Sequence, residues 1–212
     1  MGVAMKKESP GASERVGEFL FVGNHLALDL LNTRIVPDQS SVELLPDTAA
    51  LEKWLMAAGL VTSVKGKRRL RRWRDSVEAQ RFLEELRRFR ERLRAVVLQQ
   101  EAGEAISARF LAELKRLLEQ YPTRIALSAT GRTLRREVVF EPSTPLEVWA
   151  PIAAATADLL TEVDPSRVRK CESCIMHFYD VSKKSSRRWC SMNICGNRVK
   201  VAAYQQRRRA DG

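Results

Sequence analysis

The sequence predicts an α+β protein with a mainly α-helical N-terminal domain, which contains a small β-hairpin, and a small C-terminal module built from a hairpin and a helix. Three observations support this division. Apolar residues of the first 165 positions recur mostly three or four apart, a spacing typical of amphipathic helices. All four cysteines lie between Cys171 and Cys195, and the excess of basic residues lies at the same end of the chain.

The charge distribution indicates a polyanionic partner for the C-terminal module. The 212 residues include 37 Lys and Arg against 26 Asp and Glu, a net charge of +11. From Ser166 to Gly212 there are 12 basic and 3 acidic residues, whereas the first 165 residues have 25 basic and 23 acidic. A charge excess confined to one end is typical of a module that binds nucleic acid or another polyanion.

The N-terminal segment 1–17 is short, polar and mixed in charge, so we expect a disordered tail there. It lacks the apolar middle of a signal peptide, and Lys6 occupies the position at which a myristoylation signal has Ser or Thr. The sequence also has no run of the roughly 18 apolar residues that a membrane span requires. We therefore expect a cytoplasmic protein without membrane contact.

The main domain is expected over 18–164, and its first third contains two helices. The apolar run Glu18–Val22 favours a strand, and Asn24 can cap a short helix over Leu26–Leu31 that is apolar on nearly every side and so belongs to the core. The segment 35–45 is predicted to be a loop. Pro46 and Asp47 then open a second helix, for which Gly59 is a suitable end.

The rest of the main domain is predicted to be helical except for one hairpin. A densely basic stretch, Lys65–Arg74, leads into a long helical pattern that runs to Val97, and a second amphipathic helix over 106–118 ends before Pro122. Branched apolar residues around Thr130–Thr133 predict a β-hairpin. A last apolar helix follows over 149–163. The basic stretch has two interpretations, a solvated helix start or a second nucleic-acid contact surface.

The four cysteines have a spacing typical of a structural zinc site. Cys171 and Cys174 are separated by two residues, and Cys190 and Cys195 follow after a further fifteen. Two thiolates of one turn can reach the same ion at about 2.3 Å, and a second pair can complete a tetrahedron. Strands at 175–181 and 187–190 and a helix from Gly196 onward would place the pairs together. The sequence thus predicts a treble-clef-like four-cysteine zinc finger over 166–209 with one structural Zn²⁺.

Other interpretations of the cysteines stay open at this point. They could be unrelated buried thiols, paired disulfides or iron–sulfur ligands, although their clustering and the lack of an export signal favour zinc. His177 could replace a cysteine as a ligand, but a half-exposed histidine on a strand is the alternative that we favour. A module of about 40 residues cannot fold on its own apolar core, here expected from Phe178, Tyr179 and Trp189. Zinc would supply roughly 10–16 kcal/mol of folding free energy.

The residues expected to contact DNA lie around this module. A metal-folded scaffold with a cationic coat favours nucleic-acid binding, and its guanidinium groups suit phosphates or guanine edges. The candidates are Lys183, Lys184, Arg187, Arg188, Asn197, Arg198 and Lys200. The terminal triplet 207–209 could also contact DNA or could only increase solubility.

Two motifs resemble known families. Arg187-Arg188-Trp189-Cys190 followed by Cys195-Gly196-Asn197-Arg198 closely resembles the CGNR zinc finger, and the run Phe178-Tyr179-Asp180-x-Ser182 also fits it. The segment Asn24–Thr33 resembles the opening of the ABATE domain, which usually precedes this finger. The resemblance implies a bacterial, stress-responsive transcription regulator whose finger binds DNA and whose larger domain senses an effector. It also implies that the zinc ligands are Cys171, Cys174, Cys190 and Cys195.

Polar residues within the apolar segment 24–33 could form the effector site. Asp29 and Asn32 lie among apolar residues, and Thr33 follows directly. Leaving such a group buried and unpaired costs about 1–3 kcal/mol, so each needs a partner. One interpretation is that they bind neighbouring backbone; the other is a pocket for a polar ligand, with Asn24 and His25 near its mouth.

The function that we expect is a DNA-binding transcription regulator and not an enzyme. The sequence has two histidines and contains no phosphate-binding glycine loop, nucleophile elbow or zinc-protease motif. The expected partners are duplex DNA and an unidentified small-molecule effector, and the sequence leaves a homodimer open. Two alternatives are an RNA- or ribosome-associated zinc protein and an interaction module for an acidic protein, because phosphate contact alone does not separate these partners.

Overall fold

In the computed structural model, residues 15–35 and 41–210 are described, and they fall into two compact units. Unit 1 is the continuous segment Leu45–Glu162. Unit 2 combines the described residues before Leu45 with those from Val163 to Ala210. The described part is mostly helical, and each of its sheets is a two-stranded antiparallel pair. This confirms the α+β, mainly helical fold class.

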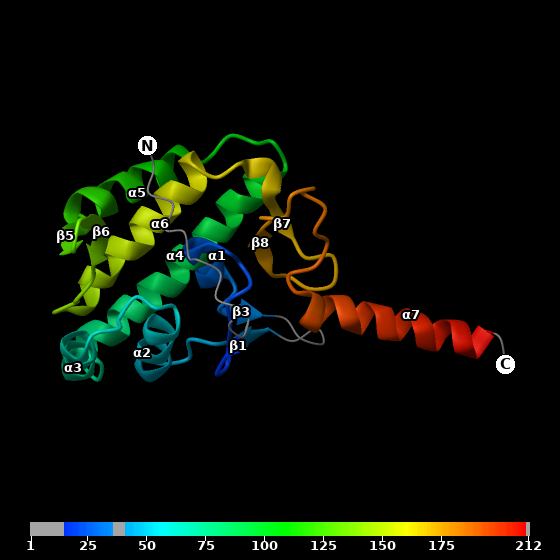
Figure 1. Cartoon of the computed structure of the whole chain (residues 1–212), viewed down its shortest axis with the longest axis horizontal. Helices are drawn as coiled ribbons and strands as arrows, with labels where there is room; N and C mark the ends of the chain where they lie inside the picture. Colours follow the sequence, from blue (N-terminus) through cyan, green and yellow to red (C-terminus); the bar gives the residue numbers. More distant parts are fainter. Residues whose placement is uncertain (1–14, 36–40, 211–212) are drawn as a thin grey trace. The chain divides into compact units, whose positions relative to one another are not determined.

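Unit 1 contains five helices and one hairpin among its described residues (Figure 1). Its elements are α2 (Thr48–Ala57), α3 (Val64–Trp73), α4 (Val77–Glu101), α5 (Ala108–Gln120), β5 (Arg124–Thr130), β6 (Thr133–Val139), the 3₁₀ turn η1 (Pro145–Val148) and α6 (Trp149–Thr161). The ends of α2 follow local chemistry: Asp47 Oδ1 accepts from the Ala50 amide at 2.7 Å, and Gly59 adopts a φ of +72° just after the helix. The hairpin closes through a two-residue turn, with Thr130 opposite Thr133.

The long helical pattern predicted from the basic stretch to Val97 is two helices in the structure. Helix α3 ends at Trp73 and α4 begins at Val77. Ser76 causes the restart, because its side-chain oxygen accepts from the Ala79 amide at 3.1 Å and caps α4. The apolar spacing continues across this break, so periodicity alone did not reveal it.

Aromatic side chains form the centre of the unit 1 core around α4. Trp149 of α6 packs edge-on against Phe82 and Phe89, with ring centroids 5.3 and 5.1 Å apart. Phe89 also stacks on Phe110 of α5 at 5.6 Å. These contacts join α4, α5 and α6, and such aromatic pairs contribute about 0.5–1.5 kcal/mol each beyond their buried area.

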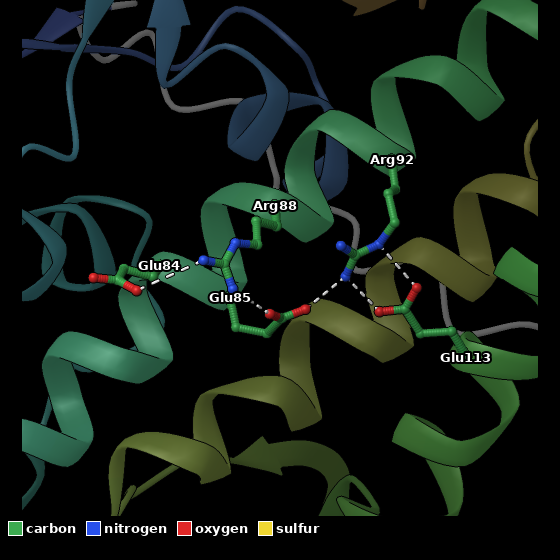
Figure 2. A network of polar contacts seen from close by, with 5 residues as sticks. All are labelled: Glu84, Glu85, Arg88, Arg92 and Glu113. Atoms are coloured by element: carbon green, nitrogen blue, oxygen red, sulfur yellow. Dashed lines mark hydrogen bonds and ion pairs between the residues drawn. The ribbon is translucent and has the colours of Figure 1, made fainter.

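The exposed sides of α4 and α5 are joined by a network of ion pairs (Figure 2). Arg92 contacts Glu113 of α5 at 2.6 Å and Glu85 at 2.8 Å, while Arg88 lies near Glu84 and Glu85. These three acidic residues thus pair with arginines of α4.

The basic stretch is also paired within unit 1. Lys65 and Arg69 contact Glu141 at 3.0 and 3.7 Å, and Arg74 contacts the buried Glu52 at 3.0 Å. These contacts fit the interpretation of the stretch as the solvated start of a helix.

The N-terminal part of unit 2 contains two short antiparallel strand pairs. One pair precedes helix α1 in the sequence and the other follows it. Its elements are β1 (Arg15–Val16), β2 (Phe19–Leu20), α1 (Leu26–Leu31), β3 (Arg34–Ile35) and β4 (Val42–Glu43). Strand β1 falls at the end of the segment predicted as a tail, whose residues 1–14 lie outside the described residues. Strands β3 and β4 occupy the ends of the predicted loop. The cap of α1 is His25, one residue later than expected.

The C-terminal part of unit 2 contains a hairpin and a long helix. Its elements are the 3₁₀ turn η2 (Pro165–Arg167), β7 (Val168–Lys170), β8 (His177–Tyr179), the π-helical turn η3 (Met192–Gly196) and α7 (Asn197–Ala210). The predicted pairing of 175–181 with 187–190 is wrong in detail, because β8 pairs with the preceding β7. The first cysteine pair therefore lies in the turn of this hairpin, and Cys195 lies in the turn that leads into α7.

Candidate metal centre and nucleic-acid interface

The four cysteine sulfurs converge on one point. They come from the β7–β8 turn, from Cys190 and from η3, and all lie within 4.8 Å of one another. The Sγ atoms of Cys174 and Cys190 are 3.7 Å apart, and those of Cys190 and Cys195 are 3.6 Å apart. A tetrahedron with Zn–S bonds of about 2.3 Å has edges of about 3.8 Å. The site therefore fits one structural zinc ion, and all four cysteines are free of disulfides.

The cysteine thiols also influence one another's protonation. Cys171 accepts S–H hydrogen bonds from Cys174 and Cys190, and this lowers the pKa of Cys171. The same interaction with Cys171 raises the pKa of Cys174 to about 12 and raises the pKa of Cys190. A bound divalent cation would stabilise all four thiolates, so zinc binding releases protons and couples metal affinity to pH.

His177 is buried on β8 and is not the half-exposed residue that we expected; its relative exposure is 2%. The metal-binding group among the described residues consists of the four cysteines without this histidine. The strand is buried because it contacts α1 and because its residue Phe178 belongs to the same apolar cluster as the cysteines.

The core around the metal centre includes residues from the far end of the chain. Phe178 is fully buried and Trp189 partly buried, as expected, but Leu20 and Val22 of the N-terminal segment belong to the same cluster, as does Met176. The cysteine module therefore does not form its apolar core alone.

A pair of hydrogen bonds joins α1 to β8. The buried Asn32 side chain donates from Nδ2 to the His177 carbonyl at 2.9 Å and accepts through Oδ1 from the His177 amide at 3.0 Å. The Tyr179 amide donates to the Gly23 carbonyl at 2.8 Å. These bonds pair with backbone groups of β8 on the edge that does not face β7. The N-terminal segment therefore supplies hydrogen-bond partners that the β7–β8 hairpin lacks.

Close packing around Gly23 fixes the segment before α1. Its amide donates to Asp29 Oδ1 at 2.9 Å, and a Cβ at this position would lie 2.9 Å from the Asp29 nitrogen and from Leu28 Cβ. Backbone contacts of that length leave room only for glycine. Asp29 therefore holds the chain reversal that brings Gly23 to Tyr179.

The other residues of the candidate effector site also bind backbone groups. Asn24 donates to the Tyr179 carbonyl at 2.9 Å, Thr33 donates to the Leu30 carbonyl at 2.7 Å, and His25 accepts from the Ala27 amide at 3.3 Å. These contacts, together with those of Asp29 and Asn32, fit the interpretation in which the polar residues tie the segment to its neighbours.

His25 makes the stability of unit 2 dependent on pH. Burial lowers the pKa of His25 from its ordinary value of 6.5 to about 4. The imidazole of the folded chain therefore takes up a proton at a lower pH than that of the unfolded chain. Stability is expected to fall as the pH decreases from 6.5 toward 4, by at most about 1.4 kcal/mol per pH unit. In denaturant titrations at pH 7 and pH 5, His25→Asn, which keeps a capping side chain, should lose less stability than the wild type. Equal losses in the two proteins would contradict this role.

A buried carboxylate shapes the loop that carries two of the predicted DNA contacts. Asp180 accepts from the Ser182 amide and from the Arg187 amide, both at 2.9 Å. Burial opposes ionisation of Asp180, but these hydrogen bonds outweigh it and hold its pKa below the ordinary value. The loop tip between them presents Lys183 and Lys184, both exposed and without an ion pair to any residue that the structure describes.

Arg187 faces inward. Its guanidinium lies 4.4 Å from the centroid of the Phe178 ring and donates to the carbonyls of Trp189, at 2.9 Å, and Cys190. This residue thus supports the second cysteine pair, and its donors are largely occupied. Its contact with phosphate remains a prediction.

Arg188 is exposed but has an acidic partner. It contacts Glu172 through Nε at 2.8 Å and through Nη2 at 2.6 Å, and it lies over the Trp189 ring at 5.2 Å. An exposed pair of this kind contributes at most about 1 kcal/mol. A phosphate group could therefore replace Glu172 as the partner of Arg188 at little cost in free energy.

The remaining candidates lie at the start of α7. Arg198 donates from Nη2 to the carbonyl of Ser173 at 3.2 Å and to the sulfur of Cys195 at 3.5 Å, so it connects α7 to the first cysteine pair. Asn197 and Lys200 are exposed. The side chains of Lys183, Lys184, Arg188, Asn197, Arg198 and Lys200 are thus all exposed on unit 2.

Several residues important to this site were missed in the sequence. Asp180 was noted only as part of the run Phe178–Ser182, and its role in the loop could have been found, because Asp two residues before Ser is a frequent turn motif. The roles of Leu20, Val22 and Gly23 had no local signal, since their partners lie more than 140 positions away.

The fold and the four converging cysteines define the chain as a zinc-finger protein. Residues 24–163 match the ABATE family, described as "Putative stress-induced transcription regulator", and residues 167–208 match the CGNR zinc finger. The chain belongs to the ABATE family. No curated protein matches the sequence. None of the described helices is long and apolar enough to cross a membrane.

Proposed function

We propose that the chain is a DNA-binding transcription regulator of the bacterial cytoplasm, in which unit 2 contacts duplex DNA and unit 1 senses a small molecule. The observation that carries this proposal is the set of exposed cations around the zinc centre. Lys183, Lys184 and Lys200 have no ion-pair partner within the described chain, in contrast to many cations of unit 1. Cations held without partners on a metal-fixed scaffold suit a phosphate backbone.

The proposed effector site is a cavity within unit 1. Its volume is about 600 Å³, within the usual range for small-molecule sites. Tyr121, Phe140 and Leu146 give it an apolar wall, and Arg124, which has no ion pair with any described residue, supplies a positive charge. An effector bound there should raise the melting temperature of the protein and change its affinity for DNA.

The full-length protein is expected to bind duplex DNA with an affinity that decreases steeply with salt. In Lys183→Gln/Lys184→Gln, the slope of log affinity against log salt should fall by about 1 for each phosphate contact that is lost. The control is Lys115→Gln/Arg116→Gln, which removes the same charge from exposed positions of α5 in unit 1. Fluorescence anisotropy with labelled DNA measures both slopes.

The same assay separates the alternatives. Structured RNA and an acidic peptide are compared with duplex DNA at fixed ionic strength. Tighter binding to RNA would favour the ribosome- or RNA-associated alternative, and tighter binding to the peptide would favour an interaction module. Equal salt slopes for the loop variant and its control would contradict the proposed surface.

A further inference from the structure

The described side chains of helix α7 are exposed to solvent. They run from Asn197 to Arg208 and include Val201, which is 54% exposed, and Tyr204, which is 56% exposed. The segment Asn197–Ala210 has five Lys and Arg and no acidic residue. Figure 1 shows α7 extending away from β7 and β8 of the same unit.

Among the residues that the structure describes, the hydrogen bonds from α7 side chains to the rest of unit 2 lie at the beginning of this helix. Arg198 attaches its first turn to Ser173. A helix of 14 residues without tertiary contacts is marginally stable in water, and α7 lacks the acidic partners that would pair with its cations. A partner outside the chain would therefore stabilise the rest of α7 as a helix.

The helical spacing sorts the residues of α7 into three faces. Asn197, Val201, Tyr204 and Arg208 follow at i, i+4, i+7 and i+11, so they form one stripe. Positions 200 and 207 lie on one side of this stripe, and positions 198 and 209 lie on the other. Each of these four flanking positions is Lys or Arg in the sequence.

This arrangement matches the major groove of duplex DNA. The groove is about 12 Å wide and admits a helix, with phosphates along both of its edges. In the stripe, an amide suits adenine, a guanidinium suits guanine and apolar groups suit the thymine methyl. Cations on both sides of the stripe suit the two phosphate backbones. The deep, narrow major groove of an RNA duplex would not accept such a helix.

We propose that α7 lies in the major groove of duplex DNA, and that DNA contact holds it helical. This inference rests on the proposed function, since it names the element of unit 2 that reads the DNA. It assigns sequence recognition to the stripe Asn197–Arg208 and leaves the loop cations at 183 and 184 to contact phosphates.

The test is a helix-breaking substitution that leaves the charge unchanged. Ala202 lies outside the stripe, and Ala202→Pro removes one backbone hydrogen bond and clashes with the preceding turn. Duplex binding should weaken by about tenfold or more, because the stripe loses most of its groove contacts. The matched control, Ala202→Ser, should bind within about twofold of the wild type, because serine is tolerated within a helix. Zinc content of one ion per chain in both variants shows that the metal centre is intact.

Circular dichroism provides a second readout. The wild type should gain helical signal on adding duplex DNA, and Ala202→Pro should gain less. If Ala202→Pro binds duplex DNA as tightly as the wild type, α7 acts as an unstructured basic tail and the inference fails, while the proposed function stands. If the wild type itself does not bind duplex DNA, the proposed function fails and the inference fails with it.

Discussion

Removing zinc is expected to unfold the whole of unit 2, including the segment 15–44 that contains no metal ligand. The structural reason is the shared core, in which Leu20 and Val22 pack in one cluster with the buried cysteines Cys171, Cys190 and Cys195. Structural zinc contributes roughly 10–16 kcal/mol to the folding of small modules, more than unit 2 could lose and remain folded. Unit 1 has its own aromatic core and should stay folded.

Hydrogen–deuterium exchange before and after chelation measures this effect. Peptides from α1 and from β8 should lose protection together, peptides from α4 should keep it, and added zinc should restore the first two. Elemental analysis should give one zinc per chain for the wild type and substantially less for Cys190→Ser. Retained protection in α1 after chelation would show that the N-terminal segment folds independently of the metal centre.

Asn32→Ala is expected to be the most destabilising change outside the metal ligands. It removes two hydrogen bonds and leaves the amide and the carbonyl of the buried His177 without their partner. The loss of unit 2 stability should be about 2–4 kcal/mol, since each buried group left unpaired costs about 1–3 kcal/mol. The rate of zinc release to a chromogenic chelator should rise accordingly, by about tenfold or more.

Asn24→Gly is the matched control for this prediction. Asn24 also bonds to β8, but it is exposed and water can replace its single hydrogen bond to Tyr179. Glycine accepts the φ of +55° at this position without strain. The control should lose at most about 1 kcal/mol. Similar losses for the two variants would contradict the role given to Asn32.

The sequence predicted the local elements and the metal centre well, because their signals are local. Asp47 and Gly59 bound α2, the residues around Gly131 form the turn of the β5–β6 hairpin, and the cysteine spacing identified the zinc site. Family resemblance was confirmed at both ends of the chain.

The sequence did not reveal that the first and last segments share a unit. The apolar residues of α1 were correctly placed in a core, but periodicity does not say which core. Asn32 was recognised as a buried polar residue in need of a partner, and only the structure shows that the partner is the backbone of β8. The sequence also did not predict that the Arg187 side chain points inward, because an arginine in a basic module is expected to be exposed.

Unit 2 combines two segments that are far apart in the sequence, and this affects how the protein folds during synthesis. During synthesis the segment with Leu20, Val22 and Asn32 leaves the ribosome well before its partners around Cys190, because more than 130 residues separate them along the chain. Such long-range pairing is slow to form, and unpaired apolar segments are prone to aggregate in the meantime. Unit 1 can fold while translation continues, whereas the zinc centre can mature only after it. A freshly made chain therefore passes through a period in which the folded unit 1 is flanked by the two segments of unit 2 before they have paired.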